Sequence, residues 1–288
     1  MKHFFILIFC IFLVSCSNKS KRFELVPISS TAKSFDNLLY TGASSDLKTQ
    51  SAKKELLTIA HKINLNETGG DRNNLVYWNP NESFPSLGIG HFIWYPEGYH
   101  ASYGDMLPSL IAFYKLNNRK VPPLLNSRYA PWSNKAELEK ARQRGELEEV
   151  IQFFENTKDV QIVFIYNRLI ASVDKMIQSS DNPRQIQTQF NRVLQTKNGL
   201  YPLIDYVNFK GEGTQPIKEY NNISWGLMQV LEGMSGSQPG KKALSDFASS
   251  CKSVLENRVK NQPRGKNDGV FLAGWKKRCD TYANALYL

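Results

Sequence analysis

The order of hydrophobic and polar positions divides the chain into three stretches. An almost unbroken apolar run covers residues 4–14, and it is too short to span a bilayer as a helix. Residues 17–50 are rich in Ser, Thr and Lys and have no sustained period, which is typical of a tether with an arm lying on a domain. Beyond these, apolar residues recur at helical spacing, so the folded domain is expected to cover residues 51–288.

The start of this domain has two distinct patterns. Residues 51–66 place apolar side chains at helical spacing and are followed by Gly69 and Gly70, a common way to end a helix. Residues 75–95 are rich in aromatic and β-branched side chains and are broken by prolines and glycines. They predict a small irregular sheet of two or three short strands directly after the helix.

Most of the remaining chain has the pattern of amphipathic helices. Residues 200–211 are apolar on nearly every side, which predicts a helix buried in the centre of the domain. The fold class is therefore expected to be α+β and predominantly α-helical, with the helices of residues 103–196 inserted as scaffold. The other helices are expected at about residues 103–117, 135–156, 158–178, 181–196, 224–233, 240–260 and 273–286, with a proline-containing connector at 118–134.

The N-terminus has the features of an export signal. Lys2 and His3 precede the apolar run, which is the order found in secretory signal peptides. Leu13, Val14, Ser15 and Cys16 match the bacterial lipobox, in which the cysteine is lipid-modified and becomes the new N-terminus. We expect residues 1–15 to be the signal peptide and residues 16–50 a tether, with Cys16 anchoring the protein to a membrane through acyl chains. Ser17 favours the outer membrane, facing the periplasm.

The chain is basic, with 36 Lys and Arg against 26 Asp and Glu and a net charge of +10. Removal of Lys2 with the signal leaves 35 − 26 = +9. Such a surplus favours polyanionic partners, which for an exported protein are peptidoglycan, teichoic acids and lipid head groups rather than nucleic acid. It argues against a polycationic substrate such as chitosan.

Histidines and cysteines are few, and they follow no ligand pattern. The four histidines form no HExxH motif and the cysteines no CxxC pair, so no metal or other cofactor is predicted. Cys251 and Cys279 are equally compatible with a disulfide and with two buried thiols. The sequence has no serine-hydrolase elbow and no phosphate-binding loop.

Glu67 is the strongest candidate for chemistry. Cleavage of a glycosidic bond needs a carboxyl that is protonated when the substrate arrives, and an apolar cleft favours that form. Glu67 ends the first predicted helix, and the apolar run Leu75–Trp78 follows it and is expected to line the site. By composition alone, a single Glu near a helix end would be an ordinary exposed residue.

Three motifs follow one another here: NETGG at 66–70, YWN at 77–79 and NESFPSLGIGHFIWYP at 81–96. Together they resemble the catalytic half of the lysozyme-like superfamily, above all the phage-type lysozymes and the lytic transglycosylases. The resemblance implies a lysozyme-like fold with Glu67 as the general acid and Trp78 near the substrate.

The same resemblance assigns roles to the SLGIGH segment. The hydroxyl of Ser86 is implied to face the cleft, Gly88 and Gly90 to let the backbone approach the sugar, and His91 to be structural. No Asp occupies the place of the phage family's second carboxylate. Glu82 is the nearest candidate for this second carboxylate, with Asp71 behind it.

Residues 200–229 resemble the buried central helix and following turn of the same superfamily. The resemblance implies that several of their side chains face the substrate or lie near it, although helical periodicity alone places Tyr206 in the core. The implied residues are Tyr206, Asn208, Gly211 and Glu212, which face substrate, and Glu219, Tyr220 and Trp225, which lie near it.

The sequence thus favours an envelope enzyme that cleaves peptidoglycan glycan strands. A lytic transglycosylase needs no second carboxylate, so this mechanism is favoured over hydrolysis by a lysozyme or chitinase. A lipoprotein that binds glycan without cleaving it is the alternative from another functional class. The sequence gives no indication of the oligomeric state.

Overall fold

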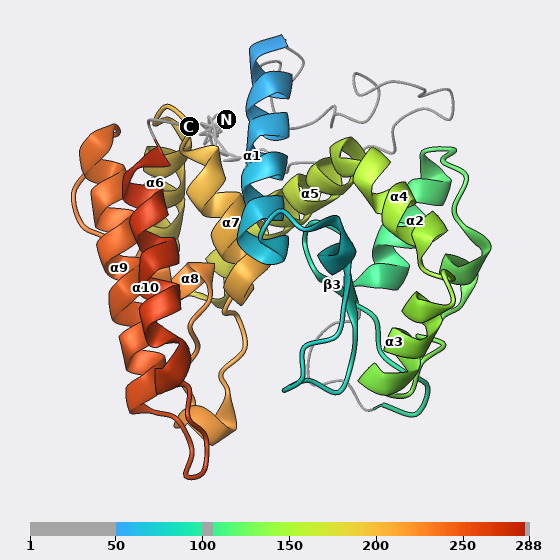
Figure 1. Cartoon of the computed structure of the whole chain (residues 1–288). Helices are drawn as coiled ribbons and strands as arrows, with labels where there is room; N and C mark the ends of the chain where they lie inside the picture. The colour runs from blue at the N-terminus through green and yellow to red at the C-terminus, as the bar shows by residue number, and fades with distance from the viewer. Residues whose placement is uncertain (1–49, 100–105, 286–288) are drawn as a thin grey trace, which may run out of the picture.

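The computed structural model describes residues 50–99 and 106–285 (Figure 1). The expected signal peptide, Cys16 and the tether lie outside these residues. The described chain is mostly helical, with one small antiparallel sheet, as the predicted fold class required. Among the helices of these residues, none combines the length and the apolar character needed to cross a membrane.

The first helix and the sheet occur where the sequence predicted them. Helix α1 covers Gln50–Thr68, and the turn η3 (Arg72–Leu75) leads into β1 (Val76–Tyr77). Strands β2 (Ser86–Leu87) and β3 (Phe92–Ile93) complete a sheet of order β1-β2-β3. Tyr77, Ser86 and Ile93 lie in one row across it.

The helices after the sheet follow the prediction with one correction. Residues 135–156 form two helices rather than one, because Gly145 adopts φ 77° and its N–H bonds Arg142 O at 2.9 Å, which ends the first helix. The helices are α2 (Leu107–Leu116), α3 (Lys135–Gln143), α4 (Glu148–Asn156), α5 (Lys158–Ser179), α6 (Pro183–Leu194), α7 (Leu200–Lys210), α8 (Leu227–Glu232), α9 (Lys241–Lys260) and α10 (Gly269–Ala283), with turns η4 (Pro123–Asn126) and η5 (Lys218–Tyr220).

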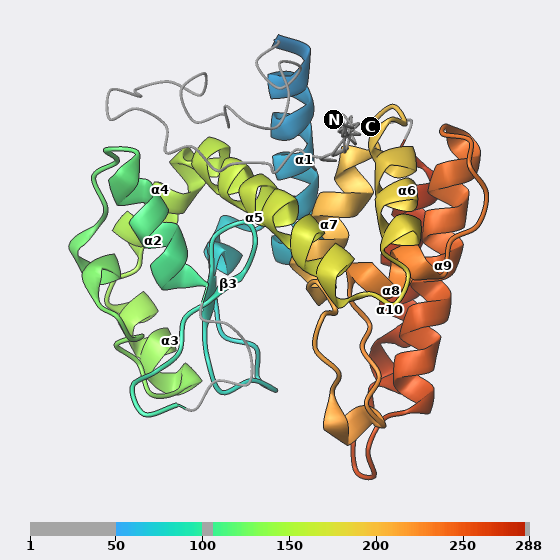
Figure 2. The same cartoon turned by 180° about the vertical axis from the view of Figure 1, so that it is seen from behind.

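Two groups of elements lie on either side of α1. Helices α2, α3 and α4 gather with the sheet at one edge, and α6 to α10 gather at the other (Figure 1). Helix α5 runs between the two groups, as the opposite view also shows (Figure 2), and packs against α1, α2, α6 and α7. A single apolar core extends from Leu56 to Ala285, so the expected insertion at 103–196 contributes to the centre of the domain.

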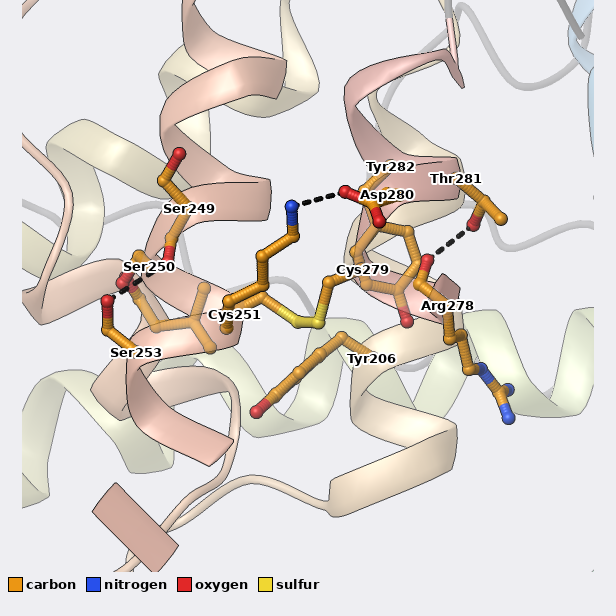
Figure 3. Close-up of a disulfide and its surroundings, with 12 residues drawn as sticks. Tyr206, Ser249, Ser250, Cys251, Ser253, Arg278, Cys279, Asp280, Thr281 and Tyr282 are labelled. Atoms are coloured by element: carbon orange, nitrogen blue, oxygen red, sulfur yellow. Dashed lines mark hydrogen bonds and ion pairs between the residues drawn. A yellow bond between two sulfur atoms is a disulfide. The ribbon is translucent and has the colours of Figure 1, made fainter. Parts of the chain in front are cut away.

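Helices α9 and α10 are joined covalently. A disulfide links Cys251 and Cys279, whose Cα atoms are 6.0 Å apart (Figure 3), and both residues are fully buried. The structure thus decides between the two states that the sequence left open. Because Cys279 directly follows Arg278, this cross-link fixes the part of α10 that reaches Glu67.

Candidate active site around Glu67

Glu67 lies in the last turn of α1, where the chain bends toward the sheet. Gly69 and Gly70 adopt φ 65° and 84°, a left-handed conformation that ends the helix. The side chain of Asn74 donates to Thr68 O at 3.0 Å and fixes the bend. The side chain of Glu67 is 15% exposed, so it reaches the surface while neighbouring groups set the orientation of its carboxylate.

One oxygen of this carboxylate is held by Arg278 of α10. Nη2 of Arg278 donates to Glu67 Oε1 at 2.7 Å. The same guanidinium binds Asp205 of α7 at two points, with Nε on Oδ2 and Nη2 on Oδ1, both at 2.8 Å. A two-point contact between a guanidinium and a carboxylate restricts orientation as well as distance, so Asp205 fixes the position from which Arg278 binds Glu67.

Asp205 is fully buried, and its hydrogen bonds are satisfied within the protein. Tyr282 O–H donates to Asp205 Oδ2 at 2.7 Å, and the amide of Asn66 donates to Oδ1 at 3.2 Å. Although burial opposes it, the charges of Asp205 and Glu67 raise the pKa of Arg278. The result is a buried polar cluster, which we call the Arg278 cluster: Asn66, Glu67, Asp205, Arg278 and Tyr282.

The second oxygen of Glu67 faces His91 from the sheet side. Nδ1 of His91 lies 3.6 Å from Glu67 Oε2, and Nε2 lies 3.2 Å from the carbonyl oxygen of Asn74. A carbonyl oxygen only accepts hydrogen bonds, so Nε2 carries a hydrogen. In neutral imidazole Nδ1 then presents a lone pair to Glu67. His91 is further held by stacking with Tyr77, with ring centroids 6.0 Å apart.

Glu67 is thus placed between α10 and the sheet, by groups up to 211 residues away in the sequence. No family model, curated protein or solved structure matches this chain. The apolar surroundings expected for the carboxyl are replaced by a guanidinium and an imidazole. The guanidinium stabilises the ionised carboxylate, and the imidazole, when neutral, can accept a hydrogen bond from the carboxylic acid.

The predicted residues of the sheet are placed differently from one another. Ser86 lies in the central strand and is 6% exposed. Trp78 is buried, and its indole N–H donates to Glu82 O at 2.9 Å, so it stabilises the hairpin rather than facing a ligand. The Glu82 side chain is exposed, and partial desolvation raises the pKa of its carboxyl. Asp71 caps η3 by accepting from Asn73 N.

Gly88 and Gly90 leave no room for a side chain within the protein. A Cβ on Gly88 would lie 2.4 Å from Gln161 Oε1, the atom that accepts from Ile89 N. A Cβ on Gly90 would lie 2.8 Å from the ring of Phe92 and 3.0 Å from Asn208 Oδ1. The close approach expected of these glycines is therefore to α5, α7 and the sheet itself.

The residues predicted from the central helix divide into core and surface. Tyr206 is fully buried and donates to Trp225 O at 2.8 Å, so the expectation that it faces substrate is wrong and the helical pattern was right. Asn208 is partly buried, and its Oδ1 accepts no hydrogen bond within the described residues. Glu212 forms an ion pair with Lys175 Nζ at 3.6 Å.

The turn after the central helix adds a mixed group of residues. Tyr220 is 8% exposed and donates to Asp268 Oδ2 at 2.8 Å, beside the largely buried Trp225. Glu219 is exposed, and Gly211 adopts φ 79° at the end of α7. The Tyr220 hydroxyl thus connects this turn to Asp268 at the start of α10.

Sequence reasoning missed Asp205, Arg278 and Lys210. Asp205 had a usable signal, because a single acid inside an otherwise apolar helix must be paired when it is buried. Arg278 had none, because it lies among other basic residues in an ordinary helical pattern. Lys210 ends α7 and lies with its Nζ 4.0 Å from the ring centre of Phe209 and 3.9 Å from that of Trp275.

Proposed function

We propose that this protein cleaves the glycan strands of peptidoglycan, on a lysozyme-like fold, with Glu67 as its catalytic acid. The observation that carries the proposal is the position of the Glu67 carboxylate. It lies in the last turn of the first helix, reaches the surface, and is placed between the guanidinium of Arg278 from α10 and the imidazole of His91 from the sheet. The helix that carries Glu67 is followed directly by the small sheet, which is the order that the resemblance to lysozyme-like enzymes implies, and this order supports Glu67 as the catalytic acid.

The two partners of Glu67 suit the two halves of such a reaction. Neutral His91 can accept a hydrogen bond at Nδ1 from the acid form, which orients the proton without removing it. Arg278 stabilises the carboxylate that remains after this proton has passed to the leaving oxygen. The 3.6 Å separation from His91 is longer than a hydrogen bond, as is common for catalytic groups without substrate. Glu67 can then act as acid in the first step and as base in the second.

Cleavage with formation of a 1,6-anhydro ring is the favoured reaction. In this mechanism Glu67 as base removes the proton of the muramic acid 6-hydroxyl, so no second carboxylate is required. The nearest buried acid, Asp205, is occupied by Arg278 and Tyr282. Hydrolysis with Glu82 as the second carboxylate, as in a lysozyme or chitinase, is the competing reaction.

The cellular setting belongs to the proposal as well. A protein anchored through Cys16 in the outer membrane and facing the periplasm would lie beside peptidoglycan. Its net charge of +10 before processing suits the carboxylates of the stem peptides and of muramic acid.

A second candidate function is glycan binding without cleavage. The contact that favours it is the 2.7 Å hydrogen bond from Arg278 to Glu67, which stabilises the ionised carboxylate. A pure binding protein has no need of the protonated form.

Product analysis separates these candidates. The full-length chain in detergent is incubated with purified peptidoglycan, and soluble fragments are identified by mass spectrometry. Anhydro-ended fragments, with equal yield from Glu82→Gln, are expected. Reducing-end fragments that disappear in Glu82→Gln would establish hydrolysis instead. Retention of glycan without any fragment would leave the binding protein as the better account.

A further inference from the structure

A row of cations and aromatic rings leads away from Glu67 along α10. Phe271, Trp275 and Arg278 are spaced i, i+4 and i+7 and so share one face of this helix. Phe209 and Lys210 of α7 fill the space between them. We call this row the cation–aromatic strip: Phe209, Lys210, Phe271, Trp275 and Arg278.

Neighbouring members of the strip are in contact. Arg278 Cζ lies 4.1 Å from the Phe209 ring centre, and Lys210 Nζ lies about as close to the rings of Phe209 and Trp275. Trp275 and Phe271 are stacked, with centroids 5.9 Å apart and an angle of 22°. Phe271 is 48% exposed and Trp275 partly exposed. From Phe271 to Arg278 the strip is about 10 Å long, roughly two sugar rings.

Lys210 is the cation of this strip without a carboxylate partner. Arg278 is paired with Asp205 and Glu67, and the adjacent Arg258 of α9 is paired with Asp268 at 2.8 Å. Within the described residues Lys210 makes no ion pair. Desolvation, together with the charges of Arg258 and Arg278, lowers the pKa of Lys210 well below its usual range, and Asp268 and Glu67 only partly oppose this.

The surroundings of the strip also favour an anion. Three exposed cations lie at the end of α9 and in its connection to α10: Lys260, Arg264 and Lys266. None of them forms an ion pair in the described part of the chain. A neutral ligand would gain contacts with the rings but would not stabilise the charged form of Lys210. A ligand with apolar faces and regularly spaced carboxylates satisfies both features.

We propose that the cation–aromatic strip binds an acidic glycan strand, with sugar rings on Trp275 and Phe271 and a sugar-borne carboxylate on Lys210. In peptidoglycan this carboxylate is the lactyl group of muramic acid. The inference rests on the proposed function for its substrate and deepens it, because it makes the acidic sugar the feature that is recognised beside Glu67.

Binding to two matched ligands tests the strip. Peptidoglycan strands freed of stem peptides are compared with the same strands after chemical reduction of their lactyl carboxylates to alcohols. The full-length protein in detergent carries Glu67→Gln, which prevents cleavage during the measurement. We expect about tenfold tighter binding of the carboxylate form, as for one charge-assisted contact. Adding Lys210→Met is expected to abolish this difference.

Two further variants control the measurement. Lys277→Met removes a charge from an exposed position of α10 and should retain the preference. Phe271→Ala, at an exposed position where a substitution should not prevent folding, should weaken the binding of both ligands by a similar factor.

Binding should also depend on pH. Because a bound carboxylate favours protonated Lys210, the preference for the carboxylate form should decrease as pH rises above neutral, and Lys210→Met should lack this pH dependence.

The outcomes separate this inference from the proposed function. Three results would overturn the proposal that the strip binds an acidic glycan: equal affinity for both ligands, an unchanged preference in Lys210→Met, or no binding of either strand. Cleavage of peptidoglycan by the wild type, combined with any of these results, would leave the proposed function standing. Carboxylate-dependent binding without cleavage would support glycan binding by the strip and contradict the proposal that the protein is an enzyme.

Discussion

Two buried arginines of the helical half of the molecule have similar partners but different surroundings. Arg192 of α6 is 2% exposed in its side chain and binds Asp246 of α9 at 2.8 Å. Its other donors bind Gln189 and the carbonyl oxygens of Ser235 and Gln238, so all its contacts lie within the fold. Arg278 also binds an aspartate, but its other hydrogen bond is to Glu67, whose side chain is 15% exposed.

This difference separates a structural cluster from a candidate functional one. Around Arg192 the charges and carbonyls fix the connection between α8 and α9. Around Arg278 the buried Asp205 fixes the guanidinium, which in turn positions the carboxylate of the partly exposed Glu67. An acid that is partly exposed and is positioned by a buried polar network is a feature of functional sites. The predictions below alter one of the two clusters at a time, or Lys210 in the cation–aromatic strip.

The largest effect on stability is expected from Asp205→Asn. This change leaves the buried Arg278 without its two-point partner and should lower the free energy of unfolding by about 3–5 kcal/mol. Asp246→Asn, at a carboxylate that is 13% exposed and also paired with Lys242, should cost less, about 1–3 kcal/mol. Urea unfolding monitored by circular dichroism measures both. A larger loss for Asp246→Asn would contradict the ranking.

Substitution of each arginine by lysine should separate stability from activity. Lys keeps the charge but loses the planar two-point contact, so both variants should lose about 1–3 kcal/mol of stability. Release of fragments from peptidoglycan should fall about tenfold or more in Arg278→Lys and remain near wild type in Arg192→Lys, measured below the unfolding temperature of each. Equal activity in the two variants would remove Arg278 from the site.

Lys210→Met is expected to stabilise the protein by about 1 kcal/mol, because it removes the desolvation cost of an amine that forms no ion pair within the described residues. This raises Tm by about 2–4 °C. Because the pKa of Lys210 is lowered on folding, the unfolded chain binds more protons between the lowered and the ordinary pKa. Wild-type stability should therefore rise with pH in that range. Lys210→Met should lack this rise. A destabilised variant with an unchanged pH slope would show that Lys210 is an ordinary packed side chain.

The smallest effect concerns acid pH and the Arg192 cluster. Although burial opposes it, hydrogen bonds from Lys242 and Arg192 lower the pKa of Asp246. Its contribution should be complete above the ordinary Asp pKa of about 3.9 and be lost as pH falls below that value. Thermal unfolding from pH 5 downward should show a shallower loss in Asp246→Asn. A slope identical to wild type would contradict this assignment.

Local patterns made much of the fold predictable. The period of α1, the glycines after it and the change to aromatic residues at 75–95 predicted the helix and the sheet, because each depends on neighbouring residues. The apolar run of α7 correctly placed Tyr206 in the core. The pattern failed at Gly145, where an amphipathic period continues across a glycine that ends one helix and begins the connection to the next.

The candidate site was less predictable, because contacts distant in sequence form it. The contact from Glu67 to Arg278 spans 211 residues, and no spacing in the sequence relates the two. Gly88 and Gly90 were recognised as glycines that permit close approach, but what approaches them is decided by the packing of α5 and α7. Asp205 shows that a lone charge in an apolar helix predicts a buried partner without identifying it.

Fragment release by wild type and Glu67→Gln, at equal concentrations on purified peptidoglycan, tests the central claim most directly. Glu67→Gln retains an oxygen for Arg278 but cannot donate the proton, so it should fold normally and lose about 10²–10⁴-fold in rate. Glu97→Gln, at an exposed position, serves as the matched control and should equal wild type. A Glu67→Gln variant that releases fragments at the wild-type rate would contradict the assignment of Glu67 as the catalytic acid.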